Sequence, residues 1–282
     1  MILESGRIRR YKIVVEPELR LDIPVFCGSM IRGAIGHALL HRYCRCGNGA
    51  LLHQEGCLYA SLFETGAGNA FVISPPAEGV IQPEESFAFH VTLLRDDSEH
   101  VDAFFNSLAT GLKHGLGVNK IPCRLYKTIP VFSDILSLEK SAYLTLSTPW
   151  FIKYGGRPVR ASELTVHSFL IALAQRQRTL VREKLIEMHV PENPELLALA
   201  DTLDGRFQVR DVSGVRRSNR QGKVHPLSGI IGTLELHSLQ EKGLESLSSL
   251  LNRSQRLHGG GKVSFGLGAG RSGPCRIALS SR

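Results

Sequence analysis

The expected secondary-structure elements occur in the same order twice, and this repeat constrains the fold more than any other feature of the sequence. Alternating apolar residues predict strands, and apolar residues three or four positions apart predict helices. The first half should contain a strand at 8–15, a helix at 29–43, strands at 70–74 and 86–94 that form a hairpin, a helix at 97–114 and an extended segment at 118–131. The second half should contain a strand at 143–147, a long helix at 164–188 with a short helical piece up to 203, strands at 207–212 and 229–237, a helix at 240–252 and strands between 262 and 279.

This β-α-β-β-α-β order is typical of ferredoxin-like domains, which place two helices on one face of a four-stranded antiparallel sheet. Two copies predict an α+β fold of two tandem ferredoxin-like domains. A local repeat supports the duplication, because Gly-Leu-Gly and then Pro-Cys-Arg occur at 115–117 and 122–124 and again at 266–268 and 274–276. We predict domains at 1–138 and 139–282, with a cysteine-containing insertion at 44–68 and a glycine-rich loop at 258–271.

The composition favours a polyanionic partner. Lys and Arg number 34 against 26 Asp and Glu, which gives a formal net charge of +8. There is no run of 18 apolar residues, and no apolar segment of signal-peptide length follows the first charges, so we expect a cytoplasmic protein without a membrane partner. Six cysteines are too few for a disulfide scaffold in a chain of 282 residues.

The glycine-rich segment from His258 to Arg271 is the most informative stretch. It is not a P-loop, because Val263 follows Lys262, and it is not a dinucleotide fingerprint, because only a dozen residues follow it. Glycines permit close approach of a phosphodiester to the backbone, and two cations flank them. The candidate RNA-binding residues here are Gly260, Gly261, Lys262, Gly266, Gly268 and Arg271. A hairpin without a ligand is the alternative.

The segment resembles the loop of the CRISPR repeat-processing endoribonucleases of the RAMP superfamily, in which Gly-x-Gly, five residues including a cation, and a second Gly-x-Gly follow one another. In this chain His258 replaces the first glycine, as in a subgroup of that family. Weaker similarities lie at 31–39, 57–64, 148–149, 217–221 and 227–232. The resemblance implies a tandem ferredoxin-like fold, a CRISPR repeat stem-loop as substrate and retention of the mature crRNA with other effector subunits. A type IV association is one hypothesis.

The resemblance also implies metal-independent cleavage without a cofactor, in which the ribose 2′-hydroxyl attacks the adjacent phosphate and leaves a 2′,3′-cyclic phosphate and a 5′-hydroxyl. Members of the family often place a histidine on or after the first helix. His37 and His41 lie there, four residues apart on one helical face, at the edge of the apolar stripe, where a side chain can be half-buried. Arg32, at the opposite edge, and Tyr43 are supporting candidates. Histidines that merely pack on the sheet, in a non-catalytic crRNA-binding subunit, are the alternative.

The stretch 206–225 is the most basic in the chain. Its cations are Arg206, Arg210, Arg216, Arg217, Arg220 and Lys223, against the single acid Asp211. A strand and hairpin of this composition could follow an RNA backbone. A solvated basic loop is the alternative, and it is the default for the arginines of the long helix, including Arg176 and Arg178. Because aromatic residues are only 7% of the chain, recognition of a duplex or hairpin backbone is favoured over base stacking.

The remaining cluster contains cysteines. Cys44, Cys46 and Cys57, with His41 or His53 as fourth ligand, could hold a tetrahedral zinc ion. The spacing departs from a zinc ribbon, and reduced thiols in a surface insertion are the alternative. If His41 were a ligand, it could not also be a catalytic base.

Overall fold

A computed structural model describes residues 8–46, 53–64, 70–132, 141–217, 224–240 and 244–274. The chain forms two compact units. The first comprises the described residues up to Phe132 together with Thr179–Met188 and Lys262–Gly266, and the second comprises the others. The domain boundary expected near residue 138 lies outside the described residues.

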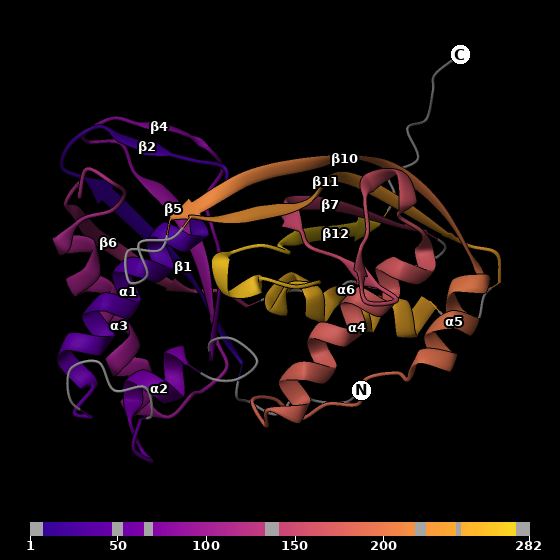
Figure 1. Cartoon of the computed structure of the whole chain (residues 1–282), viewed down its shortest axis with the longest axis horizontal. Helices are drawn as coiled ribbons and strands as arrows, with labels where there is room; N and C mark the ends of the chain where they lie inside the picture. The colour runs from indigo at the N-terminus through magenta and orange to yellow at the C-terminus, as the bar shows by residue number, and fades with distance from the viewer. Residues whose placement is uncertain are drawn as a thin grey trace. The chain divides into compact units, whose positions relative to one another are not determined.

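The first unit contains a four-stranded antiparallel sheet in the order β3-β5-β1-β6. Its strands are β1 (Arg9–Pro17), β3 (Phe71–Ser74), β5 (Phe87–Leu93) and β6 (Cys123–Pro130). Helices α1 (Gly28–Tyr43) and α3 (Ser98–His114) lie across one face of this sheet (Figure 1). A short helix, α2 (Leu58–Phe63), and a ribbon of β2 (Leu21–Ile23) and β4 (Gly79–Ile81) complete the unit. The predicted hairpin is confirmed by the β3–β5 pairing.

Helix α3 shows how the sequence specifies this unit. The Asp97 side chain caps its N-terminus by accepting a hydrogen bond from the backbone N–H of His100 at 3.1 Å. The apolar face of α3 turns Phe104 inward, where its ring centroid lies 5.0 Å from that of Phe71 on β3. Phe104 and Phe71 are both buried, so the helix docks through a continuous apolar core.

The second unit repeats the same sheet order, β10-β11-β7-β12, from β7 (Ser141–Trp150), β10 (Leu203–Arg217), β11 (Val224–Ser238) and β12 (Gly270–Pro274). Its helices are α4 (Val166–Arg182), whose last four residues are grouped with the first unit, α5 (Asn193–Asp201) and α6 (Leu244–Leu257). Gln177 on α4 donates to the Leu250 carbonyl of α6 at 3.2 Å. A small ribbon of β8 (Lys153–Tyr154) and β9 (Arg157–Pro158) and the 3-10 turn η1 (Ala161–Glu163) complete the second unit, whereas the 3-10 turn η2 (Val263–Phe265) belongs to the first unit. The predicted α+β fold with two ferredoxin-like sheets is confirmed.

The glycines of the repeated Gly-Leu-Gly tripeptide have positive φ angles in both copies. Gly115 and Gly117 have φ angles of 100° and 76°, and Gly266 and Gly268 have φ angles of 81° and 79°. The leucines between them, Leu116 and Leu267, are each 1% exposed. Each copy therefore uses positive φ angles, which favour glycine, on both sides of a buried leucine, although Gly115 has a ψ of 150° and Gly266 a ψ of 10°.

Some element boundaries differ from the predictions. Helix α4 ends at Arg182 rather than 188, because Lys184 takes a left-handed conformation with φ 55°. The Leu185 N–H bonds to the Leu180 carbonyl and the Lys184 N–H to the Val181 carbonyl, the pattern of a Schellman cap. Strands β10 and β11 each have 15 residues and are much longer than predicted. Every helix in the described ranges is too short or too polar to cross a lipid bilayer.

Candidate functional site

The two histidines predicted on the first helix are in contact. The ring centroids of His37 and His41 lie 4.4 Å apart on one face of α1. Both side chains are exposed, so neither takes the half-buried position that the edge of the apolar stripe allows. The reason is their angular position: the buried face of α1 is centred on Ile31, Ile35 and Leu39, and the histidines lie well beyond its edge.

The surroundings of His37 keep its ring neutral. Although the His37 side chain is exposed, neighbouring atoms remove part of the hydration of its ring, and this desolvation, together with the basic groups of His41, Lys120 and His114, lowers the pKa of His37 below its ordinary value. His114 is the last residue of α3, and Lys120 lies in the turn between α3 and β6. These two basic residues were missed by the sequence analysis. They are more than 70 positions from His37, and only the packing of α3 against α1 brings their charges near it.

The other two candidates on α1 lie elsewhere around the helix. Arg32 precedes His37 by five residues and Tyr43 follows His41 by two, so each is turned away by well over 90° at about 100° per residue. The Arg32 guanidinium carbon lies 3.8 Å from the ring centroid of Phe63 and 5.4 Å from that of Phe265. The Tyr43 hydroxyl accepts a hydrogen bond from the Asn106 side chain at 3.3 Å. The structure therefore groups the histidines with each other and not with Arg32 or Tyr43.

The glycines of the glycine-rich segment are used for packing. The N–H groups of Gly260, Gly261 and Gly268 donate to the carbonyls of Ala172, Phe151 and Pro149. A side chain at Gly268 would place its Cβ 2.0 Å from the Gly259 carbonyl oxygen. These N–H groups are therefore not available as a cradle for phosphate, and the expectation that the glycines admit a phosphodiester is revised at these positions.

His258 occupies the position of the missing glycine in a glycine-like conformation. Its φ angle is 62°, its side chain is 0% exposed, and its Nδ1 lies 2.8 Å from the Leu267 carbonyl oxygen. The ring thus links the two ends of the segment inside the core of the second unit. This left-handed conformation is one that glycine adopts without strain.

Residues 262–266 belong to the first unit, where they pack on the start of α1 and on β3. A Cβ at Gly28 would lie 2.3 Å from the Phe265 carbonyl oxygen, so only glycine permits this approach. Gly266 is buried, whereas Lys262 is partly exposed at φ 57°. Of the candidates in this stretch, Lys262 is therefore the one whose side chain can reach a ligand.

The basic strand and Arg271 share one face of the second sheet. Residues directly opposite in neighbouring strands point to the same face, and the register places Arg271, Thr145, Thr233 and Gln208 in one row across β12, β7, β11 and β10. Arg206 and Arg210 lie two positions on either side of Gln208, so they point the same way. A Cβ at Gly205, which precedes Arg206 and points to the other face, would meet Val166 of α4, so the helices cover that opposite face.

This row forms an open polar surface. Thr145, Thr233, Gln208 and Arg210 line a hollow of about 330 Å³. Tyr143 lies two residues from Thr145 on the same face and is half-exposed, an aromatic position that the sequence analysis missed. The sole acid of the basic stretch, Asp211, instead accepts a hydrogen bond from the Ala161 N–H at 3.0 Å. We refer to Arg206, Gln208, Arg210, Arg271, Tyr143, Thr145 and Thr233 as the open sheet face.

Part of the basic stretch lies outside the residues that the structure describes. Arg220 and Lys223 are outside the described residues, and only the backbone of Arg216 and Arg217 is described, at the tip of the β10–β11 hairpin.

An arginine of the long helix α4 is buried. The expectation of a solvated face is wrong for Arg176, which is 7% exposed and donates a hydrogen bond to the Leu257 carbonyl. Burial lowers the pKa of Arg176 to about 10.

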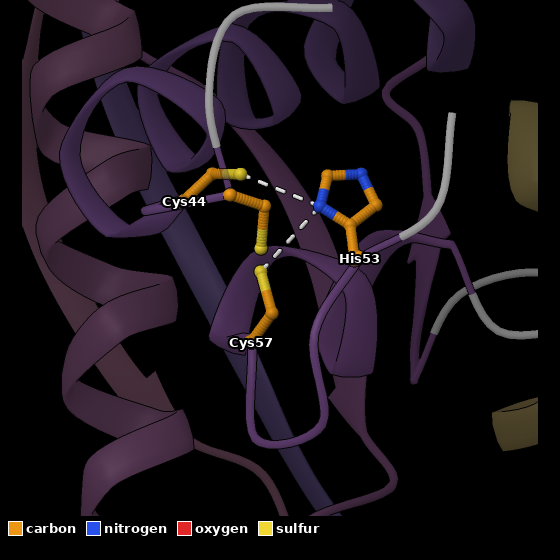
Figure 2. Close-up of side chains that lie close together, drawn as sticks. Cys44, His53 and Cys57 are labelled. Atoms are coloured by element: carbon orange, nitrogen blue, oxygen red, sulfur yellow. Dashed lines mark hydrogen bonds between the residues drawn. The ribbon is translucent and has the colours of Figure 1, made fainter. Parts of the chain in front are cut away.

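The cysteines of the insertion converge with one histidine. The ligand atoms of Cys44, Cys46, His53 and Cys57 all lie within 4.8 Å of one another. Figure 2 shows the side chains of Cys44 and Cys57 directed toward the His53 ring. His53 rather than His41 completes the group, so His41 is not drawn away from His37. The competition between a metal site and a catalytic histidine that the sequence left open does not arise in this structure.

Comparison with known proteins identifies the fold. A family model described as AF_1859_N, an N-terminal domain, matches residues 5–134. No curated protein is significantly similar to the chain. A solved Cas6 product complex is 14% identical, covers 95% of this chain and 100% of that chain, and has a TM-score of 0.61.

Other solved structures resemble the chain over a similar extent. Thermus thermophilus Cas6 is 13% identical, with coverage of 94% and 98% and a TM-score of 0.57, and a Cas6-related protein from Pyrococcus furiosus is 10% identical, with the same coverage and TM-score. In a partial Cas6-RT-Cas1–Cas2 complex, the similar chain is 11% identical with a TM-score of 0.63, and the match covers 96% of this chain and 47% of that one. At these identities the likeness establishes the tandem ferredoxin-like fold.

Proposed function

We propose that the chain is an endoribonuclease that binds the stem-loop of CRISPR repeat RNA and cleaves it by attack of a ribose 2′-hydroxyl. The observation that carries this proposal is the likeness over 95% of the chain to a Cas6 product complex, joined to a histidine pair on α1. The membership in the repeat-processing family that the sequence suggests, the retention of crRNA for effector subunits and the type IV association stay predictions.

His37 is the proposed general base. Its lowered pKa keeps the ring neutral near pH 7, so it can accept the proton of the 2′-hydroxyl. The oxygen then attacks the adjacent phosphorus, the bond from phosphorus to the 5′-oxygen breaks, and the products are a 2′,3′-cyclic phosphate and a 5′-hydroxyl. No metal is needed for this proton balance, provided that a second group protonates the leaving oxygen.

The general acid must lie on the other side of the phosphorus, because an in-line displacement separates the attacking and leaving oxygens. His41 contacts His37 on the same helical face, whereas His114 and Lys120 come from the end of α3 and the following turn. All three are candidates for the acid. The positive charges that remain stabilise the extra negative charge of the transition state.

The open sheet face is the proposed binding surface for the RNA backbone. Arg206, Arg210 and Arg271 supply charge, Gln208 and the two threonines supply hydrogen bonds, and Tyr143 can stack on an unpaired base. Lys262 of the first unit is a separate proposed contact for the RNA backbone. These contacts would hold the stem-loop without reading much of its sequence.

The test is cleavage of end-labelled repeat RNA in EDTA, beside RNA with a 2′-deoxy substitution at the cut site. We expect cleavage that persists in EDTA and is lost with the 2′-deoxy RNA. His37→Ala should abolish cleavage with little change in binding, and His189→Ala, which removes an exposed histidine from a loop, is the matched control.

A substrate with a 5′-bridging sulfur identifies the acid, because a thiolate leaves without protonation. The variant among His41→Ala, His114→Ala and Lys120→Asn that regains activity with this substrate has lost the acid. Tight binding without cleavage by the intact protein would refute the enzyme proposal and favour a crRNA-holding subunit.

A further inference from the structure

The four ligand atoms of the cysteine cluster have the spacing of a tetrahedral metal site. Zinc bonds of about 2.3 Å to sulfur and about 2.0–2.1 Å to nitrogen give tetrahedral edges of about 3.6 Å between nitrogen and sulfur. His53 Nδ1 lies 3.4 Å from Cys44 Sγ and 3.7 Å from Cys57 Sγ. Cys46 Sγ completes the set within the 4.8 Å limit.

Hydrogen bonding among these groups does not account for the convergence. The unprotonated nitrogen of a neutral imidazole has one lone pair and accepts one good hydrogen bond, yet two sulfurs approach His53 Nδ1. A cation at the common centre uses that lone pair and the three sulfurs together. A set of three thiolates and one imidazole in a tetrahedron is the preferred site of zinc.

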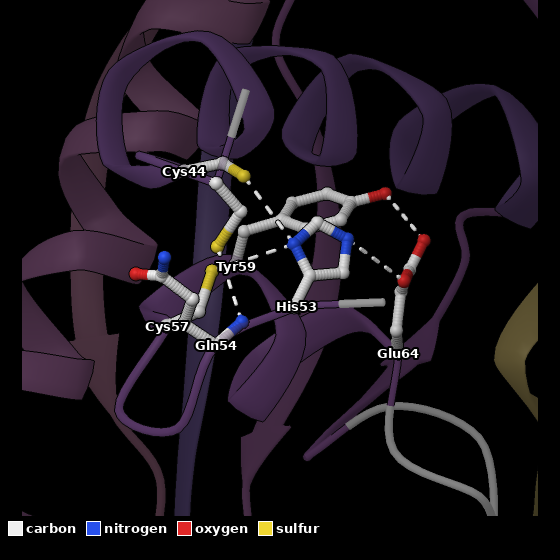
Figure 3. Close-up of polar contacts among 7 residues, drawn as sticks. Cys44, His53, Gln54, Cys57, Tyr59 and Glu64 are labelled. Atoms are coloured by element: carbon white, nitrogen blue, oxygen red, sulfur yellow. Dashed lines mark hydrogen bonds and ion pairs between the residues drawn. The ribbon is translucent and has the colours of Figure 1, made fainter. Parts of the chain in front are cut away.

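The residues around the cluster orient its ligands (Figure 3). His53 Nε2 lies 3.2 Å from Glu64 Oε2, so the Nε2–H donates to the carboxylate and Nδ1 faces the sulfurs. The Tyr59 hydroxyl donates to the other Glu64 oxygen at 3.0 Å, and the Gln54 N–H donates to Cys46 Sγ at 3.3 Å. Carboxylate support of a ligand histidine and an N–H directed at a ligand sulfur are both features of built zinc sites.

We propose that Cys44, Cys46, His53 and Cys57 bind a structural zinc ion that fastens the end of α1 to the start of α2. Cys44 is the C-cap of α1, and Cys57 is the N-cap of α2. Helix α2 has only six residues, and such a short segment gains little stability from its own backbone. The metal therefore supplies the folding free energy that this insertion lacks. It also fixes the last turn of α1, which carries His41.

This inference does not depend on the proposed function. Its test is the metal content of the purified full chain, measured by inductively coupled plasma mass spectrometry after growth with added zinc. We expect about one zinc ion per chain in the protein as purified. The cobalt-substituted protein should show intense visible bands of tetrahedral cobalt and sulfur-to-cobalt charge transfer.

Matched variants assign the ion to the cluster. Cys46→Ala and His53→Ala should lose the zinc, and His53→Cys should keep it because a fourth thiolate completes the tetrahedron. Cys123→Ala removes a buried thiol outside the cluster, and His41→Ala removes the rival histidine, so both should retain the metal. If Cys46→Ala is insoluble, the cobalt spectrum of His53→Cys still reports the site, because replacing nitrogen with sulfur strengthens the charge-transfer bands.

Three results would overturn the proposal: protein purified without bound metal from zinc-supplemented cells, zinc that remains at full occupancy in both Cys46→Ala and His53→Ala, or a mass two daltons lower that shows a disulfide within the cluster. In the cleavage test with EDTA, the zinc content should be measured in the same sample. Cleavage could be lost when this zinc leaves the protein and return when the protein binds zinc again. Such a result would report folding of the insertion and not a metal ion in the cleavage step.

Discussion

The open sheet face makes a quantitative prediction for RNA binding. Each phosphate that a cation neutralises releases counterions, so the logarithm of the binding constant falls with the logarithm of salt concentration by about 0.7 to 0.9 per contact. The face presents three exposed arginines, Arg206, Arg210 and Arg271. Replacing all three with alanine should lower the magnitude of the slope by about 2 to 3 if each contacts one phosphate.

The three arginines should not contribute equally. Arg206 is the register partner of Glu235, and an opposite charge directly across the strands offsets part of its attraction for phosphate. Arg210 is paired with Ile231, and Arg271 is paired with Thr145, so neither faces an acid across the strands. We expect Arg210→Ala and Arg271→Ala each to lower the slope by about 0.7 to 0.9, and Arg206→Ala to lower it by less.

The assay is fluorescence anisotropy of labelled repeat RNA over a salt series, with His37→Ala as the parent so that the RNA stays intact. Arg124→Ala is the control, because Arg124 is an exposed arginine that forms an ion pair with Glu16 in the first unit. A triple variant with the salt slope of its parent would refute the assignment of this face. An equal loss in Arg124→Ala would show that only net charge matters.

Three further predictions follow from the structure. The neutral ring of His37 is the proposed base, so cleavage should fall as acid protonates it. Because the pKa of His37 is lowered, the acid limb of the kcat/KM profile should lie below a pH of about 6.5. Lys120→Asn removes a nearby positive charge and should move that limb to higher pH. Gly111→Ala would place a Cβ 2.5 Å from the Ala34 carbonyl oxygen and should lower the free energy of unfolding, measured in urea, by about 1–3 kcal/mol. Gly33→Ala, whose Cβ would have nothing within 4 Å, should raise that free energy by up to about 1 kcal/mol. Equal effects of the two variants would contradict the packing of α1 on α3. Asp97→Ala removes the cap of α3 and should cost about 0.5–2 kcal/mol, which Asp97→Asn should largely restore.

Much of the fold could be predicted because its periodicities are local. The helix predicted at 97–114 begins and ends within one residue of α3, because its cap and its apolar stripe both consist of residues that are close together in the sequence. The end of α4 was not predicted because Lys184 adopts a left-handed conformation, which a lysine in the sequence does not indicate. The lengths of β10 and β11 were missed because their exposed ends are polar and no apolar alternation extends to them.

The candidate site was less predictable, because it depends on contacts between distant parts of the chain. The pairing of His37 with His41 follows from a spacing of four, but the charges of His114 and Lys120 reach them only through the packing of two helices. Likewise, the choice of His53 over His41 as partner of the cysteines depends on where the chain returns after residues 47–52. Only the register of four strands shows that Arg271 and Arg210 share a face.

The glycine-rich segment shows why one sequence pattern can be read in two ways. A phosphate-binding loop and a tightly packed turn both require residues without a Cβ, and the sequence alone does not distinguish an approaching ligand from an approaching backbone. Here the neighbours are internal: Trp150 would lie 2.2 Å from a Cβ at Gly259, and the backbone of Gly259 would lie 2.0 Å from a Cβ at Gly268. The buried His258 ring completes this packing. The glycines therefore build the scaffold, and we propose that any RNA contacts of this segment come from the side chains beside them, Lys262 and Arg271.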